Sequence, residues 1–134
     1  MDLGANLGKL VLRLTLGGLL LFHGVAKIQH GVGGIVERVA NVGLPSSFGY
    51  LVYIGEVAAP LLLIVGLWSR AAALIAAINM VVAISLAHTG QLAELSRSGG
   101  YALELQGFYF LTAVAVLLLG AGKFSVGGAN GRLN

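Results

Sequence analysis

Residues 48–89 read FGYLVYIGEVAAPLLLIVGLWSRAAALIAAINMVVAISLAHT, and this stretch decides the fold. It contains two apolar runs, 48–68 and 70–89, each close to the 20 or so residues that a helix needs to cross a bilayer. Ser69 and Arg70 stand at their junction, which leaves room only for a tight turn between antiparallel helices. Similar runs at 7–27 and 101–120 flank the pair. The sequence therefore predicts an all-α membrane protein, an antiparallel bundle of four transmembrane helices.

The composition agrees with this fold and excludes several classes of function. Of the 134 residues, 57% are hydrophobic and 10% are charged, whereas soluble domains carry about 25% charged residues. There is no cysteine, which excludes disulfides, thiolate metal sites and iron–sulfur ligation. The net charge of +3 is small and scattered along the chain, so we expect no nucleic-acid partner. The expected partner is the lipid bilayer.

The segments outside the spans predict one domain with a short surface helix and a tail. Residues 1–120 make up the four-helix transmembrane domain. Between its first two spans, residues 34–44 place apolar side chains around Glu37 and Arg38, which predicts a short amphipathic helix at the outer interface. Residues 121–134 are polar and rich in glycine. They predict a flexible cytoplasmic tail.

Basic residues near the span ends predict the orientation. Five lie on the side of the termini and three on the opposite side: Lys9, Arg13, Arg70, Lys123 and Arg132 against Lys27, Arg38 and Arg97. Cytoplasmic loops carry an excess of Lys and Arg. We therefore expect both termini in the cytoplasm.

Polar residues inside the spans are candidate functional or structural groups, since each ionisable one costs about 2.5 to 3.5 kcal/mol at a helix centre. We expect Arg13 and Glu56 to form a structural ion pair, and Asn79 to hydrogen-bond across a seam of small residues. Pro60 lacks an N–H and so leaves the carbonyl of Glu56 without its helical partner, which favours a polar pocket beside that carboxylate. Direct contact between Glu56 and a ligand or proton path stays open as the alternative.

A second set of polar residues is expected to converge at the outer end of the bundle. Neighbouring helices alternate in direction, so the ends of spans one and three meet the starts of spans two and four. The candidates for ligand binding or a proton path are His23, Lys27, Tyr53, Glu56, His88, Tyr101 and Glu104. Titratable groups gathered in one cleft are a site hypothesis.

Other chemistries find less support in the sequence. No nucleophilic triad, phosphate loop or metal-spaced cluster is present, so no catalytic residue is assigned and no metal site is expected. His23 and His88 lie on different helices and could be the axial ligands of a b-haem. We disfavour haem because Lys27 and Glu104 would stand beside it.

Four strings, in order along the chain, carry a resemblance to a known family: FHGVAKI (22–28), GEVAAPLLLIVGLWSR (55–70), INMVVAISLAH (78–88) and GYALELQGFYFLTAVAVLLLGAGKFSV (100–126). Together they resemble the DoxX family of small four-helix proteins of the bacterial inner membrane. The resemblance implies cytoplasmic termini and a role as an accessory to redox or stress proteins. Relatives include a subunit linked to thiosulfate oxidation with quinone as acceptor.

By motif, the resemblance carries over to His23, Gly24, Lys27, Gly55, Glu56, Arg70, Asn79, His88 and Glu104. The chain departs from the family after the span-two acid, where Ala59 and Pro60 replace a usual pair of glycines.

Three functions remain open. The first is a membrane subunit or accessory of an oxidoreductase that binds a quinone or similar amphiphile, with hydrogen bonds from His23 or Lys27 and protons passing through Glu56 or Glu104. The alternatives are a non-catalytic scaffold that docks a partner protein, and a small lipid or solute transporter. We rank the first highest, as an accessory rather than an autonomous enzyme, because the chain has no electron carrier of its own. Its partners would be another membrane or redox protein and, in a homo-oligomer, further copies of the chain.

Overall fold

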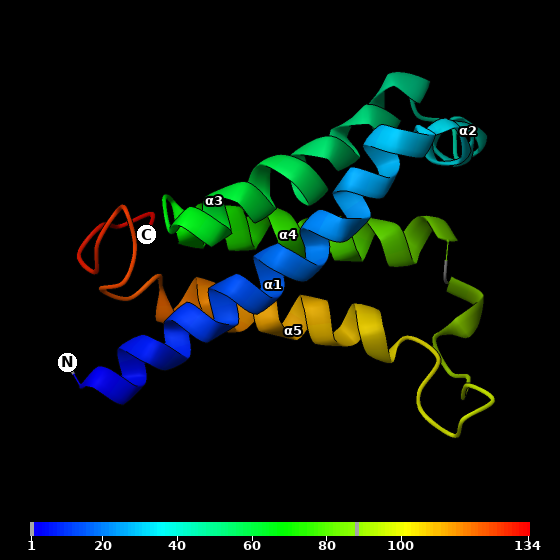
Figure 1. Cartoon of the computed structure of the whole chain (residues 1–134). Helices are drawn as coiled ribbons and strands as arrows, with labels where there is room; N and C mark the ends of the chain where they lie inside the picture. Colours follow the sequence, from blue (N-terminus) through cyan, green and yellow to red (C-terminus); the bar gives the residue numbers. More distant parts are fainter. Residues whose placement is uncertain (1, 88) are drawn as a thin grey trace.

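The computed structural model describes residues 2–87 and 89–134, which form helices joined by turns and loops (Figure 1). The α-helices are α1 (Leu3–His30), α2 (Gly33–Asn41), α3 (Ala59–Val65), α4 (Ser69–Ala87) and α5 (Glu104–Leu119). Shorter turns are η1 (Ser46–Leu51), η2 (Ile54–Ala58) and η3 (Thr89–Gln91). In this part of the chain the sole β-type pairing is an isolated bridge between Leu95 and Tyr101. The predicted all-α class is confirmed.

Three segments in the described part of the chain are long and apolar enough to cross a membrane: Leu3–His30, Ser46–Val65 and Ser69–Leu86. The second combines η1, η2 and α3 into one path. The fourth predicted span corresponds to α5, which has 16 residues. At 1.5 Å per residue α5 is about 24 Å long, shorter than the roughly 30 Å hydrocarbon core. The fourth crossing therefore stays a prediction.

The predicted surface helix is also present, as α2, with Val39 buried on its inner side. Figure 1 places α2 at one end of the molecule and the two chain ends at the other. We call the end with α2 the outer end, and the end with Leu3 and residues 121–134 the inner end.

Small side chains of α4 form the centre of the core. Ala72, Ala73 and Ala76 are completely buried, and the cluster around them includes Leu20 of α1 and Ala113 of α5. Alanine lets helix backbones approach closely, as the sequence predicted for this seam. The helices therefore pack closely around these alanines, while other large apolar side chains, such as Phe22, Ile78 and Leu118, are exposed.

The second span contains a wide turn just before Pro60. In η2, a π-helix, the N–H of Ala59 donates to the carbonyl of Ile54, five residues earlier. On α1, Gly24 faces the same turn, and a Cβ at Gly24 would lie 1.9 Å from the carbonyl oxygen of Glu56. Only glycine permits so close an approach. α1 and η2 are therefore in backbone contact at the level of Glu56.

Arg13 is fully buried but does not pair with Glu56, so that prediction is wrong. Its guanidinium donates to the carbonyl oxygens of Leu63 at 2.9 Å and Ala121 at 3.1 Å, and also to that of Phe124. Leu63 lies in the last turn of α3, where carbonyls have no partner within the helix. Arg13 therefore caps α3 at the inner end, and a cation suits the negative end of a helix.

The tail, for which the sequence predicts a flexible cytoplasmic segment, lies beside the ends of α3 and α4 and contacts both (Figure 1). The N–H of Val126 donates to the carbonyl of Val65 at 3.0 Å. The side chain of Asn134 accepts a hydrogen bond from the N–H of Ser69, at the start of α4, at 3.0 Å. The glycines that suggested flexibility serve tight turns, since Gly122 and Gly128 have φ angles of 78° and 74°. Residues 121–134 thus cap both α3 and α4.

Candidate functional site

A partly open cavity of about 700 Å³ lies towards the outer end, between α1, α2, the η1–η2 segment, α4 and α5. Most of its lining is aliphatic, with side chains such as Ile75, Val82 and Leu86 from α4. Few polar or charged side chains reach it. They are His23, Lys27, Arg38, Glu56, Asn79, Gln106 and Tyr109. A cavity of this size and polarity is typical of a site for a small apolar ligand.

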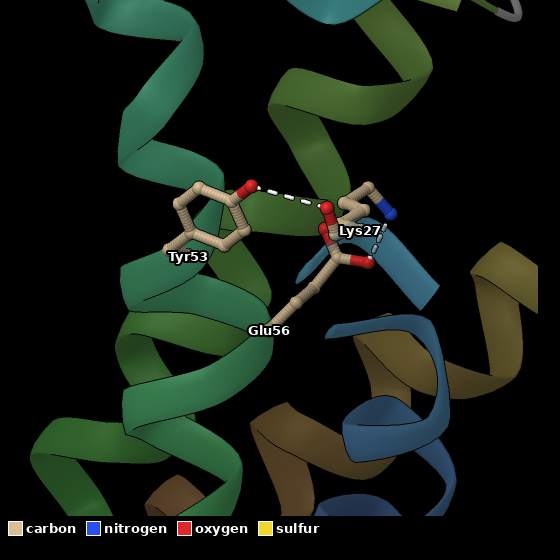
Figure 2. A network of polar contacts seen from close by, with 3 residues as sticks. All are labelled: Lys27, Tyr53 and Glu56. Atoms are coloured by element: carbon tan, nitrogen blue, oxygen red, sulfur yellow. Dashed lines mark hydrogen bonds and ion pairs between the residues drawn. The ribbon is translucent and has the colours of Figure 1, made fainter. Parts of the chain in front are cut away.

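The main polar feature of the wall is an ion pair between Lys27 and Glu56 (Figure 2). Lys27 Nζ lies 2.7 Å from Glu56 Oε1, and the two side chains are 24% and 6% exposed. The hydroxyl of Tyr53 donates to the carbonyl oxygen of Lys27 at 3.1 Å. The partner of Glu56 is therefore Lys27, with Tyr53 fastening the backbone of α1 beside it.

The local sequence explains why this pair forms. Glu56 is in η2, where the chain approaches Gly24 closely. Lys27 follows Gly24 by three residues, so it lies on the same face of α1 one turn nearer the outer end. The close approach at Gly24 thus sets the ammonium group of Lys27 against the carboxylate of Glu56.

Asn79 lies on α4 against the backbone of η2. A Cβ at Gly55 would be 2.6 Å from Asn79 Oδ1, so the absence of a side chain at Gly55 makes room for the amide. Asn79 Nδ2 is buried and has no hydrogen-bond partner among the described residues. The predicted bond from this amide across the seam is therefore not made by Nδ2.

Two aromatic rings meet at the α1–α5 side of the cavity. The rings of His23 and Tyr109 are 5.8 Å apart between centroids and almost perpendicular, at 86°, an edge-to-face geometry that is favourable. Tyr109 and Gln106 also line the cavity and are not among the residues predicted from the sequence. Their spacing of three residues on α5 was the available signal, since it puts both on one face.

The remaining candidates lie elsewhere or outside the described residues. Glu104 is exposed and does not line the cavity. Tyr101 is exposed and donates to the carbonyl of Leu92. His88 lies outside the described residues, and with it the pairing considered for haem. The predicted outer cleft therefore gathers His23, Lys27 and Glu56, with Tyr53 supporting Lys27 from behind.

The long apolar helices define a membrane protein, and the partly open cavity has the volume of a small-molecule site. The chain belongs to the DoxX family, whose family model matches residues 8–89. It is also similar to a protein of Bacillus subtilis (strain 168) described as "Putative oxidoreductase CatD", with 30% identity over 84 residues. That similarity covers 63% of this chain and 62% of the relative, so the chain matches less than two thirds of the relative's length. No solved structure matches the chain.

Proposed function

We propose that this protein is a membrane-embedded accessory or subunit of a redox system, and that its cavity binds a quinone or a similar amphiphile. The observation that carries the proposal is the aliphatic cavity of about 700 Å³ with the Lys27–Glu56 pair in its wall. Ligand sites are commonly about 300 to 1,000 Å³, largely apolar, with a few placed polar groups. The similarity to a relative described as an oxidoreductase supports the redox association.

The lining fits an apolar molecule that carries a small number of oxygen atoms. An ammonium group has three donors, and one of those on Lys27 is directed at Glu56, which leaves donors for a ligand oxygen. The imidazole of His23, also at the cavity, both donates and accepts when neutral. A quinone, when bound, supplies the acceptor for electrons and protons. Lys27, Glu56 and His23 would orient it and hold protons at Nζ, the carboxylate and the ring nitrogens.

The membrane arrangement that we propose has α5 as a fourth crossing and both termini in the cytoplasm of a bacterial inner membrane. Support for α5 comes from its packing in the same core through Ala113 and Val116. Arg70 also donates to the carbonyls of Leu117 and Leu118 at 2.8 and 2.9 Å, which caps the end of α5. A periplasm-specific reporter fused after residue 134 should be inactive, and an active fusion would contradict the orientation.

The proposal also assigns the electron-carrying step to another protein. We propose a second membrane or redox protein as the partner, in contact with this chain or with a homo-oligomer of it. Mass spectrometry of the complex solubilised under mild conditions, with quinone extraction from the same sample, should find both the partner and the quinone. A protein that purifies with a partner but never with a quinone would favour the scaffold function instead.

The direct test is ligand binding by the full chain in lipid nanodiscs. We expect decylubiquinone to bind saturably, at one site per chain, and to raise the thermal unfolding temperature. Ala83→Phe should weaken this binding, because Ala83 lines the cavity and the added ring would fill part of it. Leu74→Phe is the matched control, on the same helix but exposed and away from the cavity. No saturable binding, or equal binding by Ala83→Phe and wild type, would refute the proposed site.

A further inference from the structure

We propose that the cavity takes an amphiphile with an anionic head group, and that Arg38 of α2 binds this head group at the outer edge of the cavity. The inference rests on the proposed function in one respect, that the cavity is a ligand site. It adds the charge of the ligand and a residue that selects for it.

The first observation is which face of α2 borders the cavity. The residues of α2 that line the cavity are Ile35, Arg38 and Val39. Their spacing of three and four residues puts them on one face of the helix. The adjacent charged residue, Glu37, does not line the cavity. The positive charge of this helix is therefore on the cavity side, and the negative charge is not.

The second observation is that α2 holds this face in place while Arg38 stays accessible. A Cβ at Gly49 would lie 2.8 Å from the Cα of Val36, so α2 lies directly against η1. Val39 is buried beside it, whereas Arg38 is exposed. A molecule at the open part of the cavity can therefore reach the side chain of Arg38.

The third observation is the balance of charge around the cavity. The charged side chains in the lining are Lys27, Arg38 and Glu56. Lys27 and Glu56 neutralise each other at 2.7 Å. Arg38 has no hydrogen bond or ion pair with any described residue. His23, also in the lining, adds positive charge when it is protonated. The unpaired charge is thus positive, and a ligand of complementary charge is an anion.

The chemistry of arginine narrows the head group. A guanidinium is planar, and its N–H groups match two oxygens of a carboxylate or a phosphate. Leu44 and Phe48 also line the cavity and are about half exposed, at 50% and 48%. They offer apolar contact to a hydrocarbon chain that runs from Arg38 into the aliphatic part of the cavity. The ligand is therefore a carboxylate or phosphate amphiphile.

The experiment compares two probes with one chain and different head groups, bound by the full protein in phosphatidylcholine nanodiscs. Dodecyl phosphate is anionic and dodecanol is neutral. Arg38→Gln removes the charge at an exposed position. It should lower the ratio of the dodecyl phosphate affinity to the dodecanol affinity about fivefold, the scale of one exposed ion pair. The same comparison with laurate distinguishes the two sources, because the anion with the larger fall in ratio identifies the head group.

The matched control is Arg97→Gln, which removes the same charge from the exposed loop before α5, away from the cavity. It should leave the affinity ratio as in wild type. An equal fall in both variants would mean that anions are attracted to the surface as a whole, and would overturn the inference.

Two further measurements separate the cavity from other roles of Arg38. Ala83→Phe should weaken the binding of both probes, because Ala83 lines the cavity; unchanged binding of dodecyl phosphate would put the anion on the surface of α2 and overturn the inference. Arg38 is also in the last turn of α2, where a cation suits the helix end. A lower unfolding temperature of Arg38→Gln with an unchanged affinity ratio would show only this structural role, and would also overturn the inference.

Failure of this inference is distinguishable from failure of the proposed function. Arg38→Gln should leave decylubiquinone binding unchanged, because this probe has no charge. If wild type binds decylubiquinone and Arg38→Gln keeps the affinity ratio of wild type, the selection for an anion is wrong and the ligand site stands. If wild type binds none of the probes saturably, the ligand site and the inference both fall.

Discussion

Breaking the Lys27–Glu56 pair should destabilise the protein more than removing both charges together. In the wild type, Glu56 Oε1 lies 2.7 Å from the ammonium nitrogen of Lys27. Glu56→Gln removes this counter-ion and leaves the ammonium group unpaired at that position. Removing one partner of a buried pair costs about 3 to 5 kcal/mol. The side chain of Lys27 is 24% exposed, so screening reduces this, and we expect a loss of about 2 to 3 kcal/mol in the free energy of unfolding.

The quantity to measure is the coupling free energy in a double-variant cycle. Glu56→Gln, Lys27→Met and the double variant are unfolded reversibly in mixed micelles, with far-UV circular dichroism as the signal. We expect the double variant to lose less stability than the sum of the single variants by about 1 to 2 kcal/mol, within the range for residues in contact. Additivity within about 0.5 kcal/mol would refute the ion pair as a source of stability.

A second cycle supplies the control. Arg13→Met combined with Glu56→Gln should be additive within about 0.5 kcal/mol, because the hydrogen bonds of Arg13 go to carbonyls of the inner end. Coupling between Arg13 and Glu56, with none between Lys27 and Glu56, would show that Arg13 and not Lys27 is the partner of Glu56.

Two further substitutions test the packing and the inner end. Gly24→Ala should lower the free energy of unfolding by about 3 kcal/mol, because its Cβ would lie 1.9 Å from the carbonyl oxygen of Glu56. The control is Gly18→Ala, whose Cβ would have nothing within 4 Å and which should change the free energy of unfolding by at most about 1 kcal/mol. Equal effects of the two variants in chemical unfolding would contradict the close approach. Arg13→Met should cost about 4 kcal/mol, since hydrogen bonds from a charged group to several carbonyls are lost. A loss below about 1 kcal/mol in the same assay would show that water or other groups replace these bonds.

The sequence predicts the helices well because bilayer-length apolar runs leave little choice. The expected span 70–89 is α4, Ser69–Ala87, within two residues at each end. The first expected span, 7–27, is shorter than α1, Leu3–His30. Hydropathy marks only the apolar part of a helix, whereas the helix continues until its backbone groups are capped. In α1 the side chain of Asp2 caps the start, and at the end the N–H of Gly31 donates to the carbonyl of Lys27.

The candidate site was harder to predict, because a helical face does not specify depth. Arg13 and Lys27 are 14 residues apart on α1, almost four full turns, so both face Glu56 by periodicity. The partner is decided by the close approach of Gly24 to the carbonyl of Glu56, in the wide turn before Pro60. Tertiary contacts of this kind leave no periodic signal in one sequence.

The contacts of the tail were not predicted, for a related reason. Its glycines are typical of a mobile segment, but hydrogen bonds from Val126 and to Asn134 connect it to α3 and α4. Composition reports what a segment can do without partners. It does not indicate that the neighbouring ends of α3 and α4 have backbone N–H and C=O groups to which the segment can hydrogen-bond.

At the inner end, polar side chains supply hydrogen bonds to the backbone groups of helix ends. Within a bilayer, backbone polar groups must find their partners inside the protein. At the inner end, Arg13 donates hydrogen bonds to a carbonyl of α3, and Arg70 donates to a carbonyl of α5. The side chain of Asn134 accepts from the first N–H of α4. Among the described residues, two buried side-chain atoms remain without a partner: Ser69 Oγ at the inner end and Asn79 Nδ2 on α4.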